Sequence, residues 1–272
     1  MLRIKNRALG AIAFLVAGHV AVGADELKVG GTGAATGFLE RLAAAYSARH
    51  PGDTVEVVLG LGSTGAISAV GEAAIDLAIS GRPIKEEEKA KGLQSAPLLH
   101  TPFIFVTSHP QGQKLTKSDI VAIHDGRLVK WADGKEIRPV LRPKSDSVTP
   151  FLHAKFDGMQ AAMDKLRQRP DVPVAATDQD NKDMAEKVPN SFAGMTLLQF
   201  ITEAPRLRGI GIDGVQASVA AMEEGTYKLA MTLYMVGQPN PSPVVRRFIS
   251  FTYSAEAAKL IRESGGMLTR AD

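Results

Sequence analysis

Hydrophobic and polar positions change period repeatedly along the chain, and the changes predict strands and helices that follow one another. Residues 26–31, 54–60 and 75–80 have the apolar, β-branched character of short strands. Between them, residues 37–51 and 65–74 place apolar side chains on one helical face. A strand-helix-strand-helix-strand order predicts parallel strands joined by crossover helices.

The alternation of strands and helices continues to the end of the chain. Residues 173–189 have the pattern of a strand, a turn and a helix. Because the helix-rich middle differs in composition from the rest, we expect an α/β protein of two lobes, each a mainly parallel sheet flanked by helices. The other expected elements are helices within residues 85–93, 115–134, 149–156, 159–169 and 243–266, the last broken near Tyr253, and strands within residues 103–108, 140–143, 193–200 and 228–237.

The first 24 residues have the pattern of a secretory signal peptide. Three basic residues precede an apolar run, and the segment ends at Val22 and Ala24 with the small side chains that a signal peptidase accepts. A membrane anchor is less favoured, because the run is shorter than the ~20 apolar residues that span a bilayer. The chain has no cysteine for disulfides or a lipid anchor. We therefore expect a soluble periplasmic protein that begins at Asp25.

Removal of this leader changes the charge balance. Residues 1–24 contain three basic and no acidic residues, so the 32 basic residues fall to 29, equal to the 29 acidic ones. A chain without net charge has no overall basic field to attract nucleic acid. Nucleic acid is therefore not an expected partner.

Two glycine-rich turns provide the first candidate chemistry. Residues 31–37 and 60–65 each follow a predicted strand and lead into a predicted helix, and the second matches the G-x-G-x-x-G pattern of dinucleotide sites. Such a site requires an acidic residue at the end of the next strand to bind the ribose hydroxyl. Neither next strand, at residues 54–60 or 75–80, ends in one. A nicotinamide cofactor is therefore not expected.

Both turns suit a small anion better. Thr32 and Thr36 lie in the first turn, Ser63 and Thr64 lie in the second, and a helix N-terminus offers free N–H groups with a partial positive charge. Because parallel strands bring their carboxyl ends to one edge of a sheet, the two turns are expected to face one ligand. The alternative, which is simpler for either turn alone, is that these hydroxyls are ordinary helix caps.

Two later turns favour a shared anion site. Arg142 lies beside Ser147 and Thr149 after a predicted strand, and Thr177 begins another strand-to-helix turn. An arginine fork binds two oxygens of a tetrahedral oxyanion at once. A handful of charge-assisted hydrogen bonds, each contributing about 1.5–3 kcal/mol, reaches the ~8 kcal/mol of micromolar binding after association costs. Such binding requires no cofactor and no metal.

The segments around these turns resemble the phosphate-binding proteins of ABC importers, which belong to the two-lobed (type II) periplasmic solute-binding proteins. The most specific segment has L-T-x-x-D-I-x-x-I from Leu115 and a tryptophan, Trp131, shortly before an Asp-Gly pair. The resemblance implies two lobes that close on an anion, lobe I from residues 25–101 and 232–272 and lobe II from residues 102–231. It also implies a monomer that serves the membrane permease of an ABC importer. The resembling segments are residues 31–46, 60–84, 115–143, 225–236 and 248–266.

The resemblance also implies a set of ligand contacts, and this sequence departs from the family pattern at Ala34 or Ala35, at Val148 and, most consequentially, at Gly81. Gly81 stands where phosphate binders often have an acidic residue, which lets a site require a proton on its ligand. Asp146 and Asp178 are alternative acceptors, and Arg82 either adds a cationic contact or pairs with the acidic run 86–88. The implied contacts are Ala35, Thr36, Ser63, Thr64, Gly65, Ser80, Arg82, Arg142, Ser147, Thr149 and Thr177.

Other classes of function are less favoured. The histidines are scattered without an H-x-x-x-H pattern, and neither the G-x-S-x-G nor the S-x-x-K motif occurs, so we expect no metal site and no catalytic residue. A periplasmic hydrolase of phosphate esters and a receptor that docks on a membrane sensor are the alternatives. Within the binding class phosphate is expected first, with sulfate, arsenate, molybdate and tungstate open.

Overall fold

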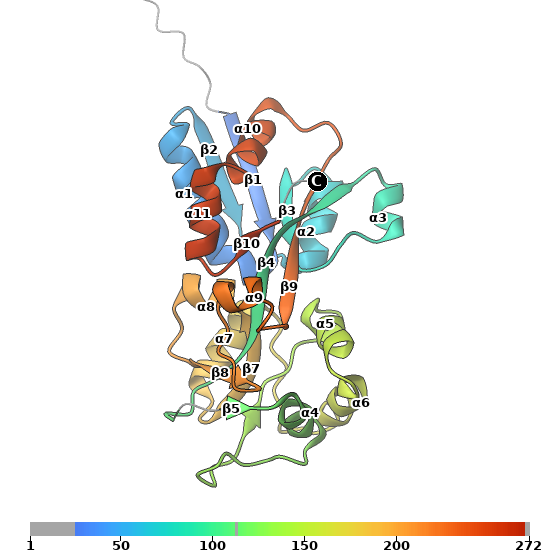
Figure 1. Ribbon diagram of the computed structural model, residues 1–272. Helices are drawn as coiled ribbons and strands as arrows, with labels where there is room; N and C mark the ends of the chain where they lie inside the picture. The colour runs from blue at the N-terminus through green and yellow to red at the C-terminus, as the bar shows by residue number, and fades with distance from the viewer. Residues whose placement is uncertain (1–24, 112–113, 270–272) are drawn as a thin grey trace, which may run out of the picture.

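A computed structural model describes residues 25–111 and 114–269, and it shows two α/β lobes joined by two long strands (Figure 1). The predicted leader, residues 1–24, lies outside the described residues. Among the described residues, no helix combines the length and the apolar character needed to cross a bilayer. The joining strands are β4 (Gln94–Thr107) and β9 (Ala230–Gly237), which pair with each other in antiparallel register.

Lobe I contains the strand-helix alternation that the N-terminal pattern predicts. Its sheet has the order β2-β1-β3-β9-β4, in which β1 pairs with β2 and β3 in parallel. The carboxyl ends of these three parallel strands therefore lie at one edge of the sheet. The elements are β1 (Asp25–Gly31), a 3₁₀ turn η1 (Gly33–Ala35), α1 (Thr36–Arg49), β2 (Asp53–Val58), α2 (Gly62–Gly71), β3 (Leu77–Ser80), α3 (Glu86–Ala90), α10 (Pro243–Thr252), α11 (Ala255–Glu263) and β10 (Met267–Leu268).

Lobe II is built around the second half of β4. That half pairs with β7 and β8 in antiparallel register, while β7 pairs with β6 and β8 pairs with β5 in parallel. The elements are β5 (Lys114–Leu115), α4 (Lys117–Asp125), β6 (Arg138–Pro139), α5 (Val148–Lys155), α6 (Met159–Leu166), α7 (Asp178–Lys187), β7 (Ser191–Thr196), α8 (Leu197–Glu203), β8 (Arg208–Ile212) and α9 (Val219–Glu223).

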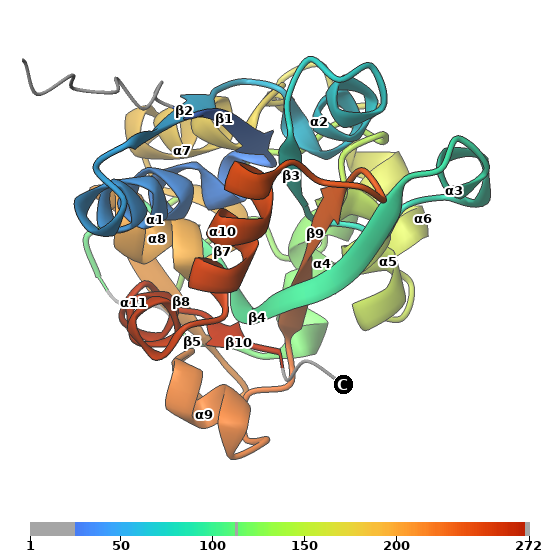
Figure 2. The same ribbon diagram turned by 90° about the horizontal axis from the view of Figure 1, so that it is seen from above.

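Each lobe has its own apolar core. Phe38 and Tyr46 of α1 pack with Phe248 of α10 in the core of lobe I, and the rings of Phe105 and Phe192 stack in that of lobe II. Figure 2 shows α1, α10 and α11 together over one side of the lobe I strands. The lobe junctions predicted near residues 101 and 232 fall within β4 and β9, which run from one lobe to the other, and they stay predictions.

The α/β fold class is confirmed, with two corrections of detail. The mainly parallel pairing is wrong for the centre of the sheet, because β4 and β9 pair antiparallel with their neighbours. The strand predicted at 193–200 ends at Thr196. Thr196 is the N-cap of α8, because its hydroxyl accepts a hydrogen bond from the Gln199 amide. The predicted break near Tyr253 is confirmed between α10 and α11.

Candidate anion-binding site between the lobes

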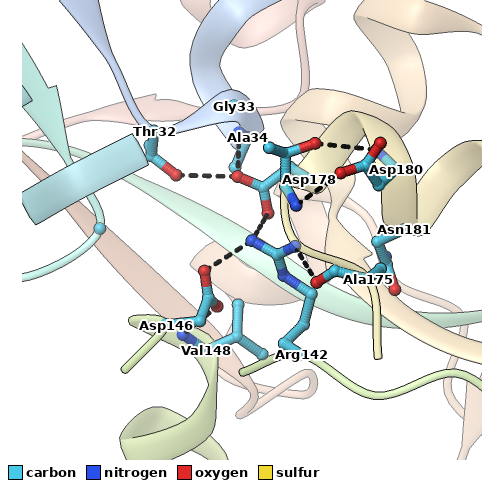
Figure 3. Close-up of polar contacts among 12 residues, drawn as sticks. Thr32, Gly33, Ala34, Arg142, Asp146, Val148, Ala175, Asp178, Asp180 and Asn181 are labelled. Atoms are coloured by element: carbon cyan, nitrogen blue, oxygen red, sulfur yellow. Dashed lines mark hydrogen bonds and ion pairs between the residues drawn. The ribbon is translucent and has the colours of Figure 1, made fainter. Parts of the chain in front are cut away.

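The first glycine turn meets a carboxylate from the other lobe. At the end of β1, the Thr32 side chain caps no helix. Its hydroxyl donates to Oδ2 of Asp178 at 3.1 Å, and the Ala34 amide donates to the same oxygen at 2.9 Å (Figure 3). Asp178 is the first residue of α7 in lobe II. The anion acceptor at this turn is therefore a side chain of the protein itself.

Arg142 connects this carboxylate to a second one. Its Nη2 lies 3.4 Å from Oδ1 of Asp178 and 2.6 Å from Oδ2 of Asp146, while its Nη1 donates to the Ala175 carbonyl at 2.8 Å (Figure 3). Only 7% of the Arg142 surface is exposed. One guanidinium therefore faces two carboxylates, and the cluster carries an excess negative charge when both are ionised.

The position of Asp178 is electrostatically costly. Burial raises the pKa of its carboxyl above the ordinary range, and the negative charge of Asp146 adds to the rise, while Arg142 and the bonds from Thr32 and Ala34 oppose it. A cavity of about 20 Å³ beside Arg142 is lined by core residues of lobe II, such as Phe105 and Phe192, and its lining includes no residue of the first turn. In this conformation the Thr32 hydroxyl and the Ala34 amide therefore both donate to Asp178.

Gly33 permits the close contact between the lobes at this point. A Cβ atom added to Gly33 would lie 2.3 Å from Oε1 of Gln179 and 2.8 Å from the Cβ of Asp178. The Gln179 side-chain amide also donates to the Gly33 carbonyl at 2.9 Å. Glycine is therefore required because the backbone of the first turn touches the start of α7.

The second glycine turn is more open. Ser63 and Thr64 lie in the first turn of α2, which has no side-chain cap. The buried Ser63 hydroxyl accepts a hydrogen bond from the Gly81 amide at 2.9 Å, at the end of β3. Thr64 and Gly65 are exposed to solvent. This turn therefore keeps donors that face solvent.

Arg82 combines the two interpretations left open by the sequence. Its guanidinium makes a two-point ion pair with Glu88 at 2.8 and 2.9 Å, and its Nη2 also lies 3.4 Å from the Thr64 hydroxyl. Ser80 shapes the preceding turn, since its hydroxyl donates to the Arg82 carbonyl at 2.7 Å. The structure thus places a cation, already paired, beside the second turn.

Gly81 has no space for the acidic side chain that the resemblance suggests at this position. A Cβ atom there would lie 2.5 Å from Oγ of Ser147 and 2.8 Å from Cε of Met231. Ser147, just before α5 in lobe II, therefore reaches the end of β3 in lobe I. The carboxylate that contacts lobe I is instead that of Asp178, at the first turn.

The remaining predicted contacts have partners elsewhere. The Thr149 hydroxyl is 2% exposed and donates to the Pro143 carbonyl at 2.8 Å, and Thr177 caps α7 by accepting from the Asp180 amide. Ala35 is fully buried in the core of lobe I, and Thr36 begins α1. The structure thus brings Ser63, Ser80, Arg82 and Ser147 around Gly81 and sets Arg142 opposite the first turn, whereas Thr149 and Thr177 bond within lobe II. Their roles as ligand contacts stay predictions.

Sequence reasoning gave too little weight to Thr32 and Asp178. The sequence marks Thr32 only as a hydroxyl of the first turn and Asp178 only as an alternative acceptor. A signal was present, because Thr177 and Asp180 have the spacing of a capping box and therefore set Asp178 as the first helical residue. The contact itself joins residues 146 positions apart, which no local pattern indicates.

The sequence profile of the PBP superfamily domain matches residues 17–256, so the chain belongs to this family of periplasmic binding proteins. The resemblance noted from the sequence is confirmed by that match. The expectation of a binding protein in place of an enzyme is confirmed in the same way. Among curated proteins, none matches the chain significantly.

Solved structures share the fold at low sequence identity. A substrate-binding protein from Clostridium perfringens, assigned to phosphate ABC transport and solved with bound phosphate, has a TM-score of 0.77 at 17% identity and covers 90% of this chain and 100% of its own. An ABC-type phosphate transport receptor from Vibrio cholerae has a TM-score of 0.62 at 19% identity, covering 89% and 100%. The regulatory domain of CcmR from Synechocystis PCC6803 in complex with 2-PG has a TM-score of 0.54 at 16% identity, covering 84% and 95%. The likeness to these three proteins establishes the fold.

Proposed function

We propose that the protein is a periplasmic solute-binding protein that captures a small oxyanion, phosphate first, between its lobes. The observation that carries this proposal is that buried Arg142 of lobe II faces, across Asp178, the amide and hydroxyl donors of a helix-starting turn of lobe I. Amides, hydroxyls and a guanidinium are the groups that bind tetrahedral oxyanions. The C. perfringens protein, which has this fold, holds phosphate, and this supports phosphate as the first candidate.

Arg142 has unused capacity for a ligand. Within residues 25–111 and 114–269, its Nε atom is buried and has no hydrogen-bond partner. A buried N–H group without an acceptor costs free energy that a bound oxyanion would recover. Ser63, Thr64 and Ser147 supply further donors around Gly81. The lobes would favour the closed form with ligand because that form makes contacts to the anion from both sides.

Proton content is expected to decide between oxyanions. Asp146 pairs with Arg142 within lobe II, and its negative charge opposes a fully ionised dianion such as sulfate. A ligand that brings a proton can donate a hydrogen bond to a carboxylate, and hydrogen phosphate or hydrogen arsenate does so at neutral pH. We therefore expect phosphate and arsenate to bind more tightly than sulfate, molybdate or tungstate.

Calorimetry with these five oxyanions tests the proposal. The variant Arg142→Lys keeps the positive charge but loses the two-point fork, and it should bind phosphate more than tenfold more weakly. Arg138→Lys is the matched control, because Arg138 is an exposed arginine of lobe II that pairs with Glu136. Equal affinities for the Arg142 variant and the wild type would remove Arg142 from the site. Failure of all five anions to bind would refute the function.

Export and delivery are part of the same proposal. The leader predicts a mature protein that starts at Asp25, which mass spectrometry of the exported protein checks. Delivery to the membrane permease of an ABC importer predicts that phosphate uptake by the cell requires the protein. Normal uptake in its absence, with phosphate binding intact, would favour a receptor that docks on a membrane sensor.

A further inference from the structure

The contact between Asp178 and the first turn has the form of an anion site with its anion already in place. The Ala34 amide and the Thr32 hydroxyl both donate to one oxygen, Oδ2, and the guanidinium of Arg142 lies beside the other, Oδ1 (Figure 3). These are the donors that the proposed function assigns to a solute. The carboxylate therefore competes with the solute for the same groups.

Within lobe II, the Asp178 carboxylate faces Arg142 at 3.4 Å. Arg142 is already neutralised within lobe II by Asp146 at 2.6 Å and is bonded to the Ala175 carbonyl at 2.8 Å. A second buried carboxylate adds desolvation cost and repulsion from Asp146. The hydrogen bonds made by the Asp178 carboxylate, at 2.9 and 3.1 Å, go to lobe I. The benefit of this side chain therefore lies between the lobes.

The start of α7 presents this carboxylate rigidly. Thr177 and Asp180 form a reciprocal capping box, with hydrogen bonds of 3.0 Å in both directions, so the backbone around Asp178 is fixed. The next residue, Gln179, crosses to the Gly33 carbonyl at 2.9 Å. Two consecutive residues of α7 thus contact the first turn, and both contacts break if the lobes separate.

We propose that Asp178 is a tethered anion that latches the two lobes together in the absence of solute and leaves the first turn when an oxyanion binds there. The latch itself is independent of the ligand, whereas the competition rests on the proposed function. If the latched form dominates, the apparent affinity for solute is reduced by the small fraction of molecules that are unlatched. Removal of the carboxylate should therefore open the ligand-free protein and tighten binding.

The variant Asp178→Ala tests both parts, and Asp183→Ala is its control. Asp183 lies on the same helix and is exposed, so its loss changes the net charge equally without touching lobe I. Small-angle X-ray scattering without ligand should give a larger radius of gyration for Asp178→Ala only. Titration with inorganic phosphate should give an affinity at least about tenfold higher for Asp178→Ala than for the wild type.

The outcomes separate the latch from the proposed function. A radius of gyration for Asp178→Ala equal to that of the wild type overturns the latch, whatever phosphate does. A larger radius with no phosphate binding in either protein supports the latch and refutes the function. Weaker or unchanged phosphate binding by an opened Asp178→Ala overturns the competition, because it makes Asp178 a ligand contact or a bystander.

A second variant keeps the test valid if Asp178→Ala folds poorly. Thr32→Val removes one of the two lobe I donors while keeping the shape of the side chain. It leaves α7 unchanged and should open the ligand-free protein less than Asp178→Ala does. An unchanged radius in a folded Thr32→Val, as judged by circular dichroism, would count against the latch.

Discussion

The two glycine turns of lobe I are similar in sequence and differ in what they face. Each follows a parallel strand, carries hydroxyls and starts a helix without a side-chain cap. The first turn donates to Asp178 of lobe II, which is 8% exposed. The second turn bonds within lobe I, between Ser63 and Gly81, and leaves Thr64 exposed. The donors of the first turn are thus bonded to a carboxylate of the protein, whereas the second turn keeps an exposed hydroxyl.

The nearby arginines show the same difference. Arg82 forms a two-point ion pair with one carboxylate, that of Glu88. Arg142 faces two carboxylates and keeps one buried N–H group without a partner in the described chain. The second turn therefore has a balanced charge, whereas the first has excess negative charge beside unused donor capacity. If the proposed function holds, this contrast makes the first turn the place where ligand and protein compete.

The largest expected effect comes from removing the arginine at the first turn. Arg142→Ala leaves buried Asp178 and half-buried Asp146 without their cation, and the free energy of unfolding should fall by about 3–5 kcal/mol. Arg82→Ala is the comparison at the second turn and should cost about 1 kcal/mol, since its pair is nearer the surface. Urea denaturation measures both. Equal losses would contradict the contrast between the turns.

The next largest difference between the two turns is expected when a glycine of each is replaced by alanine. Gly33→Ala places a Cβ atom against Gln179 and Asp178, so it should open the lobes and increase the radius of gyration. Gly65→Ala in α2 meets only ordinary contact, with Leu61 at 3.9 Å, and should stabilise the helix by up to about 1 kcal/mol. Scattering and thermal unfolding measure these effects. An unchanged radius for Gly33→Ala would mean that the lobes tolerate the added atom.

A smaller effect is expected at the exposed hydroxyl of the second turn. Thr64→Val removes a donor without burying or exposing apolar surface elsewhere, so phosphate affinity should fall about fivefold with an unchanged melting temperature. Ser68→Ala on the same helix is the control, because the Ser68 hydroxyl bonds only to Glu72 nearby. Calorimetry compares them. Equal affinities for the two variants would place the ligand away from the second turn.

The smallest effect is the pH dependence of stability due to Asp178. The folded protein raises the pKa of this carboxyl, through burial first and Asp146 second, so its charged form costs stability at neutral pH. That cost is lost as pH falls through the raised pKa towards the ordinary value of 3.8. The other charged groups near Asp178 are Arg142 and, through Gln179, Glu203.

The variant Asp178→Asn isolates this contribution. The free energy of unfolding of the wild type, relative to the variant, should rise between about pH 7 and about pH 4, as measured by urea denaturation. Acidic groups with lowered pKa values, such as Asp53 beside Arg247, act in the opposite direction and cancel in the comparison. A relative stability that falls on acidification would show that Asp178 is better stabilised as a carboxylate.

The sequence by itself determined the local elements and the family. The alternation of periods indicated the parallel strands of lobe I, the helix at 178–187 and the break between α10 and α11, because these depend on neighbours within a few residues. It also indicated both glycine turns and Arg142 as candidate chemistry. Such a local pattern does not indicate which distant residue forms a hydrogen bond or ion pair with each of these side chains.

Only the tertiary structure decided those partners. Asp178 reaches Thr32 across 146 positions, Ser147 takes the space at Gly81, and Arg82 keeps Glu88 while touching Thr64. The first two contacts cross between the lobes, and a shift of a few ångströms between the lobes would break them. Two turns of similar sequence therefore differ in their partners, because the packing of the lobes sets which acceptor lies within hydrogen-bond distance.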